Sequence, residues 1–234
     1  DGPIYPVGAN KAKGHIFLSY KAYQNYSSNT KLHLDGGINN LRFQTSKRST
    51  KNSDNQKIIL YTGMLSKWGG LSYLLKAFEK IKDPDIKLWI CGHGHSKDLN
   101  IALKSDSRIS FLGLVPESKL NGVYRDASVF VNPRPSQILG NKMNFPSKVL
   151  VYLSYGKPVI STFTDGLSPE YRDILEILEE ETEACLANKI EEILNWSENE
   201  IYQNREKIRN YLLEKKTWDI QGKNLISWLN NEII

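Results

Sequence analysis

The chain has 234 residues, of which 40% are hydrophobic and 24% are charged, so it is typical of a globular protein with one large domain or one domain and part of a second. The net charge of +5 is mild and the basic side chains form no dense cluster, so we expect no nucleic-acid partner. No apolar run approaches the ~18 residues of a membrane span, and the first residues do not resemble a signal peptide. The two cysteines have no motif spacing. We therefore expect a cytoplasmic protein.

The first forty residues predict a strand at 15–20, a short helix at 21–26 and a second strand at 31–34. Two strands cannot form a stable sheet unaided, so they either extend the following domain or belong to a neighbouring one. Residues 41–56 are polar and aperiodic, which is typical of a linker or an exposed loop.

From residue 57 onward, strands and helices alternate regularly. We expect strands at 58–61, 87–91, 109–112, 128–132 and 158–161, with intervening helices at 71–81, 97–103, 118–126 and 148–155. Ser118 follows Pro116-Glu117 and is expected to cap its helix. The remainder predicts helices at 170–178, 181–196, 198–214 and 218–229. This order indicates an α/β fold with a doubly wound parallel sheet and a helical carboxyl-terminal tail.

The stretch from Asn144 to Thr162, NFPSKVLVYLSYGKPVIST, organises the chain. Ser147 is a favourable N-cap, Gly156 and Pro158 end the helix, and a β-branched strand follows. A helix N-terminus carries free N–H groups and roughly half a positive charge, so it is suited to bind phosphate. The same arrangement also occurs in proteins that bind nothing there.

Ligands of doubly wound sheets lie beyond the carboxyl ends of the strands, where this chain has glycine-bearing loops. Lys67 follows the first of these strands, and Arg134 and Lys148 both follow the fourth; all three offer positive charge for phosphates. Each glycine loop, taken alone, is more often a plain turn. His93 and His95 lack a third metal ligand at suggestive spacing, and neither a dinucleotide fingerprint nor a Walker loop is present.

The ordered motifs YTGMLSKWGG, LWICGHG, ISFLGLVPESKL, VFVNPRP and FPSKVLVYLSYGKPVIST closely resemble the carboxyl-terminal domain of GT-B glycosyltransferases of the family 4 type, in the branch of bacterial capsule and surface-polysaccharide clusters. The resemblance implies a Rossmann-like half of a GT-B fold. Residues 1–40 would be a remnant of the amino-terminal acceptor domain, 41–56 the linker, and 57–234 the sugar-nucleotide-binding domain. The best-matching donor-site residues are Gly63, Leu114, Ser147 and Lys148.

The chain departs from the family pattern at several of these positions. Arginine and lysine residues that face phosphate in many members correspond to Met64 and Gly69, which leaves Lys67 as a substitute. Of two glutamates eight positions apart, the first corresponds to Met143. The second, which grips the ribose hydroxyls, corresponds to Val151, and losing that bond typically costs about 1.5–3 kcal/mol.

The resemblance therefore implies a glycosyltransferase that moves a sugar from a nucleoside-diphosphate sugar to a glycan or lipid-linked acceptor hydroxyl. By resemblance we expect retention of configuration, no metal and no cofactor apart from the donor substrate. The catalytic base is expected in the missing amino-terminal half, so we expect the chain to be inactive alone. The resemblance is also compatible with association at the inner-membrane surface and with a separate chain that supplies that half. The alternative is a non-catalytic binding or scaffold subunit with a decayed donor site, which Val151 and Met143 favour.

Overall fold

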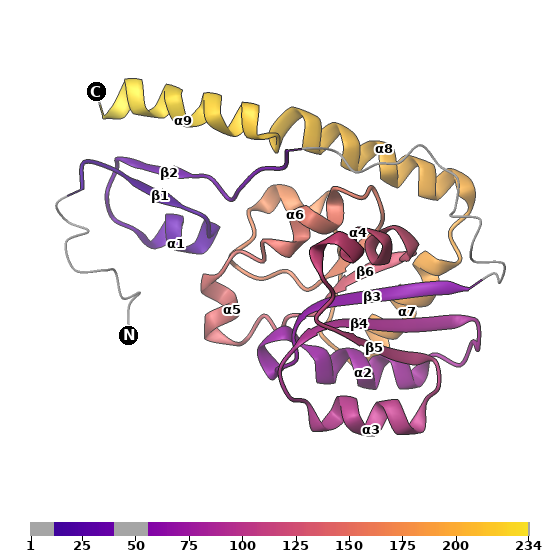
Figure 1. The fold of residues 1–234 in the computed structure, drawn as a ribbon. Coiled ribbons are helices and arrows are strands. Elements are labelled where there is room, and N and C mark those ends of the chain that lie inside the picture. The colour runs from indigo at the N-terminus through magenta and orange to yellow at the C-terminus, as the bar shows by residue number, and fades with distance from the viewer. Residues whose placement is uncertain (1–11, 40–55, 234) are drawn as a thin grey trace.

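The structure is a computed structural model that describes residues 12–39 and 56–233. Most of the predicted linker and the first eleven residues of the predicted remnant lie outside these ranges. The described elements form a parallel sheet covered by helices on both faces, with a small amino-terminal unit beside it (Figure 1). None of the described helices is both long and apolar enough to span a membrane.

The sheet has six parallel strands in the order β5-β4-β3-β6-β7-β8. They are β3 (Lys57–Met64), β4 (Ile86–His93), β5 (Ile109–Gly113), β6 (Val129–Asn132), β7 (Val159–Ser161) and β8 (Glu176–Ile177). From β3 the chain continues through β4 to β5 at one edge of the sheet, and from β6 it continues through β7 to β8 at the other edge. The sequence-based prediction of a doubly wound sheet is therefore confirmed, and the strand order reverses between β3 and β6.

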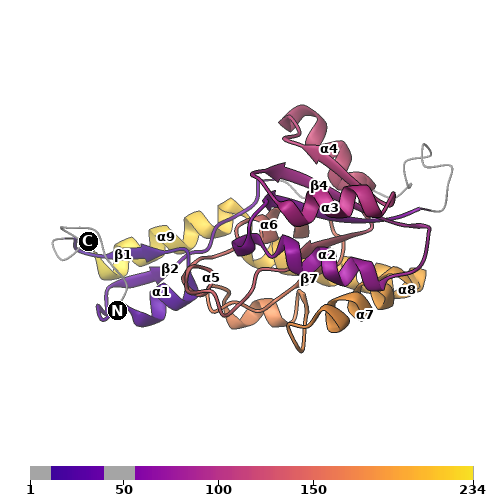
Figure 2. The same ribbon diagram turned by 90° about the horizontal axis from the view of Figure 1, so that it is seen from below.

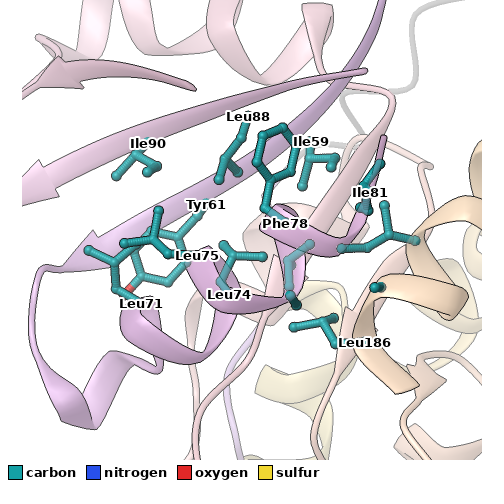
Figure 3. Packing of buried hydrophobic residues seen from close by; sticks show 14 of the residues in the cluster. Ile59, Tyr61, Leu71, Leu74, Leu75, Phe78, Ile81, Leu88, Ile90 and Leu186 are labelled. Atoms are coloured by element: carbon teal, nitrogen blue, oxygen red, sulfur yellow. The ribbon is translucent and has the colours of Figure 1, made fainter. Parts of the chain in front are cut away.

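Helices cover both faces of the sheet and enclose two apolar clusters. One cluster is formed with α2 (Leu71–Lys80), α3 (Lys97–Ser105) and α7 (Glu183–Leu194), and the other with α4 (Glu117–Asp126), α6 (Lys148–Leu153) and α8 (Glu198–Lys215). Figure 3 shows the first cluster, in which Leu71, Leu74 and Phe78 of α2 face β3 and β4. Their spacing places them on one helical face, which explains why the sequence predicted this helix nearly to the residue.

The predicted helix at 170–178 is wrong. The structure has a short 3₁₀ turn, η3 (Pro169–Arg172), followed by strand β8. Ile174, Leu175 and Leu178 are all buried, at a spacing that also fits a helix. Pairing of β8 with β7 is a non-local contact that this local periodicity does not reveal.

Two helix starts also differ from the sequence-based expectation. Helix α4 begins at Glu117 after Pro116, and no side chain caps it, so the expected Ser118 cap is wrong. A short helix that the sequence did not predict, α5 (Leu139–Met143), lies between β6 and α6. By contrast, α8 begins with a full capping box in which Ser197 and Glu200 satisfy each other's backbone N–H groups.

The amino-terminal unit consists of β1 (His15–Phe17), α1 (Tyr20–Asn25) and β2 (Lys31–His33), and its two strands pair in parallel. The last helix, α9 (Trp218–Glu232), lies along this unit (Figures 1 and 2). A buried ion pair joins the unit to the junction of α8 and α9, where Lys216 Nζ lies 2.7 Å from Asp35 Oδ1. The predicted division into domains remains a prediction.

Candidate functional site: a cationic crevice at the switch point

The two central strands separate where the strand order reverses. β3 pairs with β6 only at Ile59 and Leu60, whereas its pairing with β4 continues to Met64. The main chain of β3 beyond Leu60 is therefore left without a strand on its β6 side. In doubly wound sheets this is the place where ligands bind.

Side chains of α6 occupy the space that β6 vacates. Tyr152 Oη accepts a hydrogen bond from Thr62 N–H at 3.0 Å, and Lys148 Nζ donates to the Thr62 carbonyl oxygen. The two side chains are four residues apart and share a face of α6. Both main-chain groups of Thr62 are thus satisfied by α6, which fixes Lys148 at the switch point between β3 and β6, the place where doubly wound sheets have their ligand crevice.

Lys148 and Arg134 place two positive charges in this crevice without a neutralising acid. Burial, together with the nearby Arg134 guanidinium, lowers the pKa of Lys148 to about 8, and burial also lowers the pKa of Arg134. Among residues 12–39 and 56–233, no aspartate or glutamate forms an ion pair with either side chain. Two half-buried cations without an acidic partner could hold an anion such as phosphate, which would offset the cost of their desolvation.

The absence of a side chain at Gly63 allows Lys148 to lie across the end of β3. A Cβ at this position would clash with Lys148 Nζ, and the backbone has a φ of +152°, which L side chains rarely adopt. The ammonium also lies 5.1 Å from the centroid of the Tyr61 ring, within cation–π range. Gly63 is therefore required both for the backbone conformation and for the position of the lysine.

Ser147 does not act as the sequence suggested. It occupies the N-cap position of α6, but its backbone is helical and its side chain caps nothing. The N–H groups of Ser147, Val149 and Leu150 donate to nearby carbonyl oxygens of the same turn. These three N–H groups are therefore already engaged, whereas the side chains of Lys148 and Arg134 form no ion pair within the described residues.

The other predicted site residues lie apart from this contact group. Lys67 is exposed in the short 3₁₀ turn η2 (Lys67–Gly69), and Leu114 is 74% exposed after β5. Within the described residues, no hydrogen bond or ion pair joins either side chain to Lys148. Val151 is 39% exposed and lies one helical turn from Lys148, on the same face of α6.

Asn141 is a structural residue of the site that the sequence did not identify. Its side chain, 1% exposed, donates to the carbonyl oxygens of Trp68 at 3.0 Å and Pro135 at 2.9 Å. These carbonyls belong to the loops that follow β3 and β6, so Asn141 joins the two sides of the crevice. Tyr61 and Thr62 were also missed as site residues. Asn141 lies in none of the sequence motifs. Tyr61 and Thr62 open the motif YTGMLSKWGG, but their contacts are with the distant Lys148 and Tyr152, which the motif does not reveal.

The described residues contain no group of three or more histidine, cysteine, aspartate and glutamate side chains suited to a metal ion. His93 lies at the end of β4, and neither it nor His95 is part of such a group.

The family model described as "Glycosyl transferases group 1" matches residues 56–195, which is more than half of the chain. The chain belongs to this glycosyltransferase family. An uncharacterized glycosyltransferase of Methanocaldococcus jannaschii is 28% identical over 196 residues, covering 77% of this chain and 46% of that protein. The chain thus spans about half the length of this curated relative.

Solved structures show the same fold at low sequence identity. A glycosyltransferase from Rickettsia africae superposes with a TM-score of 0.77 at 17% identity, covering 97% of this chain and 68% of that one. Anabaena HepE, crystallised in complex with UDP and glucose, gives a TM-score of 0.72 at 15% identity, covering 94% of this chain and 63% of that one. These neighbours confirm the expected Rossmann-like half of a GT-B fold with a helical carboxyl-terminal segment.

Proposed function

We propose that this glycosyltransferase chain supplies the donor-binding half of an enzyme that moves a sugar from a nucleoside-diphosphate sugar to an acceptor hydroxyl. The observation that carries the proposal is that Lys148 and Arg134 lie together at the switch point of the sheet and that neither forms an ion pair with an acidic side chain of the described residues. A diphosphate is the anion that every donor of this class shares. The complex of Anabaena HepE with UDP and glucose supports a uridine nucleotide as the first ligand to test.

The same two cations would assist the chemistry as well as binding. Negative charge develops on the leaving diphosphate as the bond to the sugar breaks, and fixed positive groups lower the energy of that transition state. Lys148 is held by the Thr62 carbonyl and the Tyr61 ring, so it needs little reorganisation. Retention of configuration, independence from metal and cofactors, and a role in polysaccharide or glycoconjugate synthesis are parts of this proposal that rest on the family resemblance.

The acceptor side of the reaction belongs to the same proposal. We expect a glycan or lipid-linked acceptor and a base from the amino-terminal half, which precedes the described sheet or is supplied by a separate chain. A cytoplasmic enzyme working at the inner-membrane surface would fit such an acceptor.

Titration calorimetry with UDP tests the proposal. Lys148→Met keeps the length of the side chain but removes its charge, so UDP should bind about tenfold to a hundredfold more weakly, the equivalent of ~1.5–3 kcal/mol for a charge-assisted bond. The matched control is Lys157→Met. Lys157 also donates to main-chain carbonyls, those of Tyr124, Arg125 and Ala127. It lies, however, just before the start of β7, at the opposite ends of the strands from Lys148. UDP affinity should be unchanged in this control, and an equal loss in both variants would contradict the assignment.

A non-catalytic scaffold subunit is the second candidate. It is favoured by the exposed Val151 at the position where the resemblance implies a ribose-binding glutamate. This candidate predicts no heat of binding with millimolar UDP or UDP-sugars, whereas the first predicts saturable binding that depends on Lys148.

A further inference from the structure

The segment that carries Arg134 is stiff by its sequence. Pro133 and Pro135 flank the arginine, and each proline ring locks its own φ. A residue that precedes a proline is also restricted, which disfavours the helical region for Arg134. The segment comes directly after β6, so these restrictions hold the main chain of the arginine at the carboxyl ends of the central strands.

Other segments engage the carbonyl groups of both prolines. Gly70, at the start of α2, has a φ of +77° and packs so closely that a Cβ there would lie 1.8 Å from the Pro133 carbonyl oxygen. Asn141 Nδ2 donates to the Pro135 carbonyl oxygen at 2.9 Å. The loop after β3 and helix α5 therefore hold the main chain on either side of the arginine.

Thr162 contacts the main chain of Arg134 directly. It follows β7, it is completely buried, and its hydroxyl donates to the Arg134 carbonyl oxygen. A threonine side chain is β-branched and stiff at χ1, so the direction of its hydroxyl group is well defined. The pairing of β6 with β7 ends at Asn132 and Ser161, and this hydrogen bond joins the two segments beyond that last pair.

The position of Arg134 affects the anion site. Burial is the main cause of the lowered pKa of Lys148, and the Arg134 charge adds to it, so the guanidinium lies near the ammonium. A long arginine side chain can adopt many rotamers, and a fixed main chain removes part of that freedom before a ligand binds. Support of the arginine main chain should therefore be visible in the affinity for a diphosphate.

We propose that Thr162 is a positioning residue for Arg134. Its hydroxyl holds the Arg134 carbonyl group and thereby keeps the guanidinium beside Lys148, where both cations meet the diphosphate. This inference rests on the proposed function and deepens it, because it adds a residue that acts on the ligand only through another residue. Without the hydrogen bond, the freed carbonyl group turns toward another donor and moves the arginine with it.

A double-mutant cycle measured by titration calorimetry of the 234-residue chain with UDP tests the inference. Thr162→Val keeps the shape of the side chain but removes the donor, and it should weaken UDP binding at least about threefold. Arg134→Met removes the charge and should weaken binding by about tenfold or more. In the Arg134→Met background, Thr162→Val should change the affinity by no more than about twofold, because no guanidinium is left to position.

Two further variants serve as controls. Thr162→Ser keeps the hydroxyl group and should bind UDP as the unaltered chain does. Thr164→Val is the matched control, because Thr164 is 1% exposed and its Oγ1 has no hydrogen-bond partner among the described residues. It should leave the UDP affinity unchanged. If Thr162→Val does not fold, Thr162→Cys takes its place in the cycle, since a thiol is only a weak donor.

The possible failures are distinguishable. Equal losses from Thr162→Val in both backgrounds would overturn the inference, because the residue would then act on the fold and not through Arg134. An unchanged affinity in Thr162→Val, or an equal loss in Thr164→Val, would overturn it as well, and each of these results leaves the nucleotide site intact. No binding of UDP to the unaltered chain at millimolar concentration would overturn the proposed function together with the inference.

Discussion

The lowered pKa of Lys148 makes diphosphate binding depend on pH in a definite direction. Burial and the Arg134 charge bring the pKa to about 8 in the free protein, while a bound diphosphate would raise it by favouring the charged form. With a pKa near 8, about 90% of the lysine is charged at pH 7 and about 10% at pH 9. Apparent UDP affinity should therefore fall about tenfold between these two values, in proportion to the competent fraction.

Proton uptake on binding gives an independent measure of the same event. Titration at pH 9 in two buffers with different ionisation enthalpies should show that about 0.9 proton is taken up per UDP bound, against about 0.1 at pH 7. The phosphates of UDP lose their last proton near pH 6, so their charge does not change in this window. Arg134 stays charged, and burial raises the pKa of Tyr61 to about 12.

The same lysine should also affect stability. Its folded-state pKa is below that of the unfolded chain, so between about pH 8 and pH 10.5 the unfolded state holds the proton that the folded state has lost. This lysine should therefore make the free energy of unfolding increase as the pH rises through this window, and the increase should be absent in Lys148→Met. A UDP affinity that stays constant from pH 7 to pH 9, with no proton uptake at pH 9, would refute the assignment of Lys148 to the anion site.

Three further substitutions test the architecture of the crevice and its support. Gly63→Ala should displace the Lys148 ammonium and strain the backbone by roughly 1–3 kcal/mol, so calorimetry should show at least tenfold weaker UDP binding. Lys216→Met should lower the free energy of unfolding in urea by about 3–5 kcal/mol, because it leaves the buried Asp35 carboxylate without its cation. Asn141→Leu removes two hydrogen bonds between the flanking loops, so it should cost about 1–3 kcal/mol of stability and weaken UDP binding several-fold.

Each substitution has a matched control in the chain. Gly122→Ala places a methyl group in open space on α4 and should leave UDP binding unchanged. Lys215→Met removes an exposed lysine 3.5 Å from Glu170 and should change stability by no more than about 1 kcal/mol. Asn204→Leu removes a different buried asparagine, on α8, and should affect stability but not UDP affinity. Gly122→Ala or Asn204→Leu weakening UDP binding as much as its test variant would show that Gly63 or Asn141 has no special role in the site. Lys215→Met lowering stability as much as Lys216→Met would show the same for the buried ion pair of Lys216 with Asp35.

Local signals were sufficient to predict most of the fold. The apolar spacing of α2 and the β-branched runs of β3 and β7 report directly which face is buried, so these elements were predicted within a few residues. β8 was missed because two residues are too short for a periodic pattern and their pairing with β7 is non-local. The segment at 170–178 carries apolar residues at helical spacing, and only the sheet contact decides between the alternatives.

The positions of the predicted site residues follow partly from the topology, although their role in binding stays a prediction. Gly63 lies near the end of β3, Arg134 follows β6 and Lys148 begins α6, and the fold brings the three together. The role of Thr62 depends on a side chain 86 residues later in the sequence, so no motif reveals it. Ser147 was predicted as a cap from residue type alone, whereas its backbone conformation prevents that role.

The central claim is that Lys148 and Arg134 together bind a diphosphate at the point where β3 and β6 separate. A crystal structure of the chain with UDP tests it most directly. The account predicts phosphate density within hydrogen-bonding distance of both Lys148 Nζ and the Arg134 guanidinium, beside Gly63. Phosphate density at another surface, with Lys148 still donating to the Thr62 carbonyl and no ligand near it, would contradict the account.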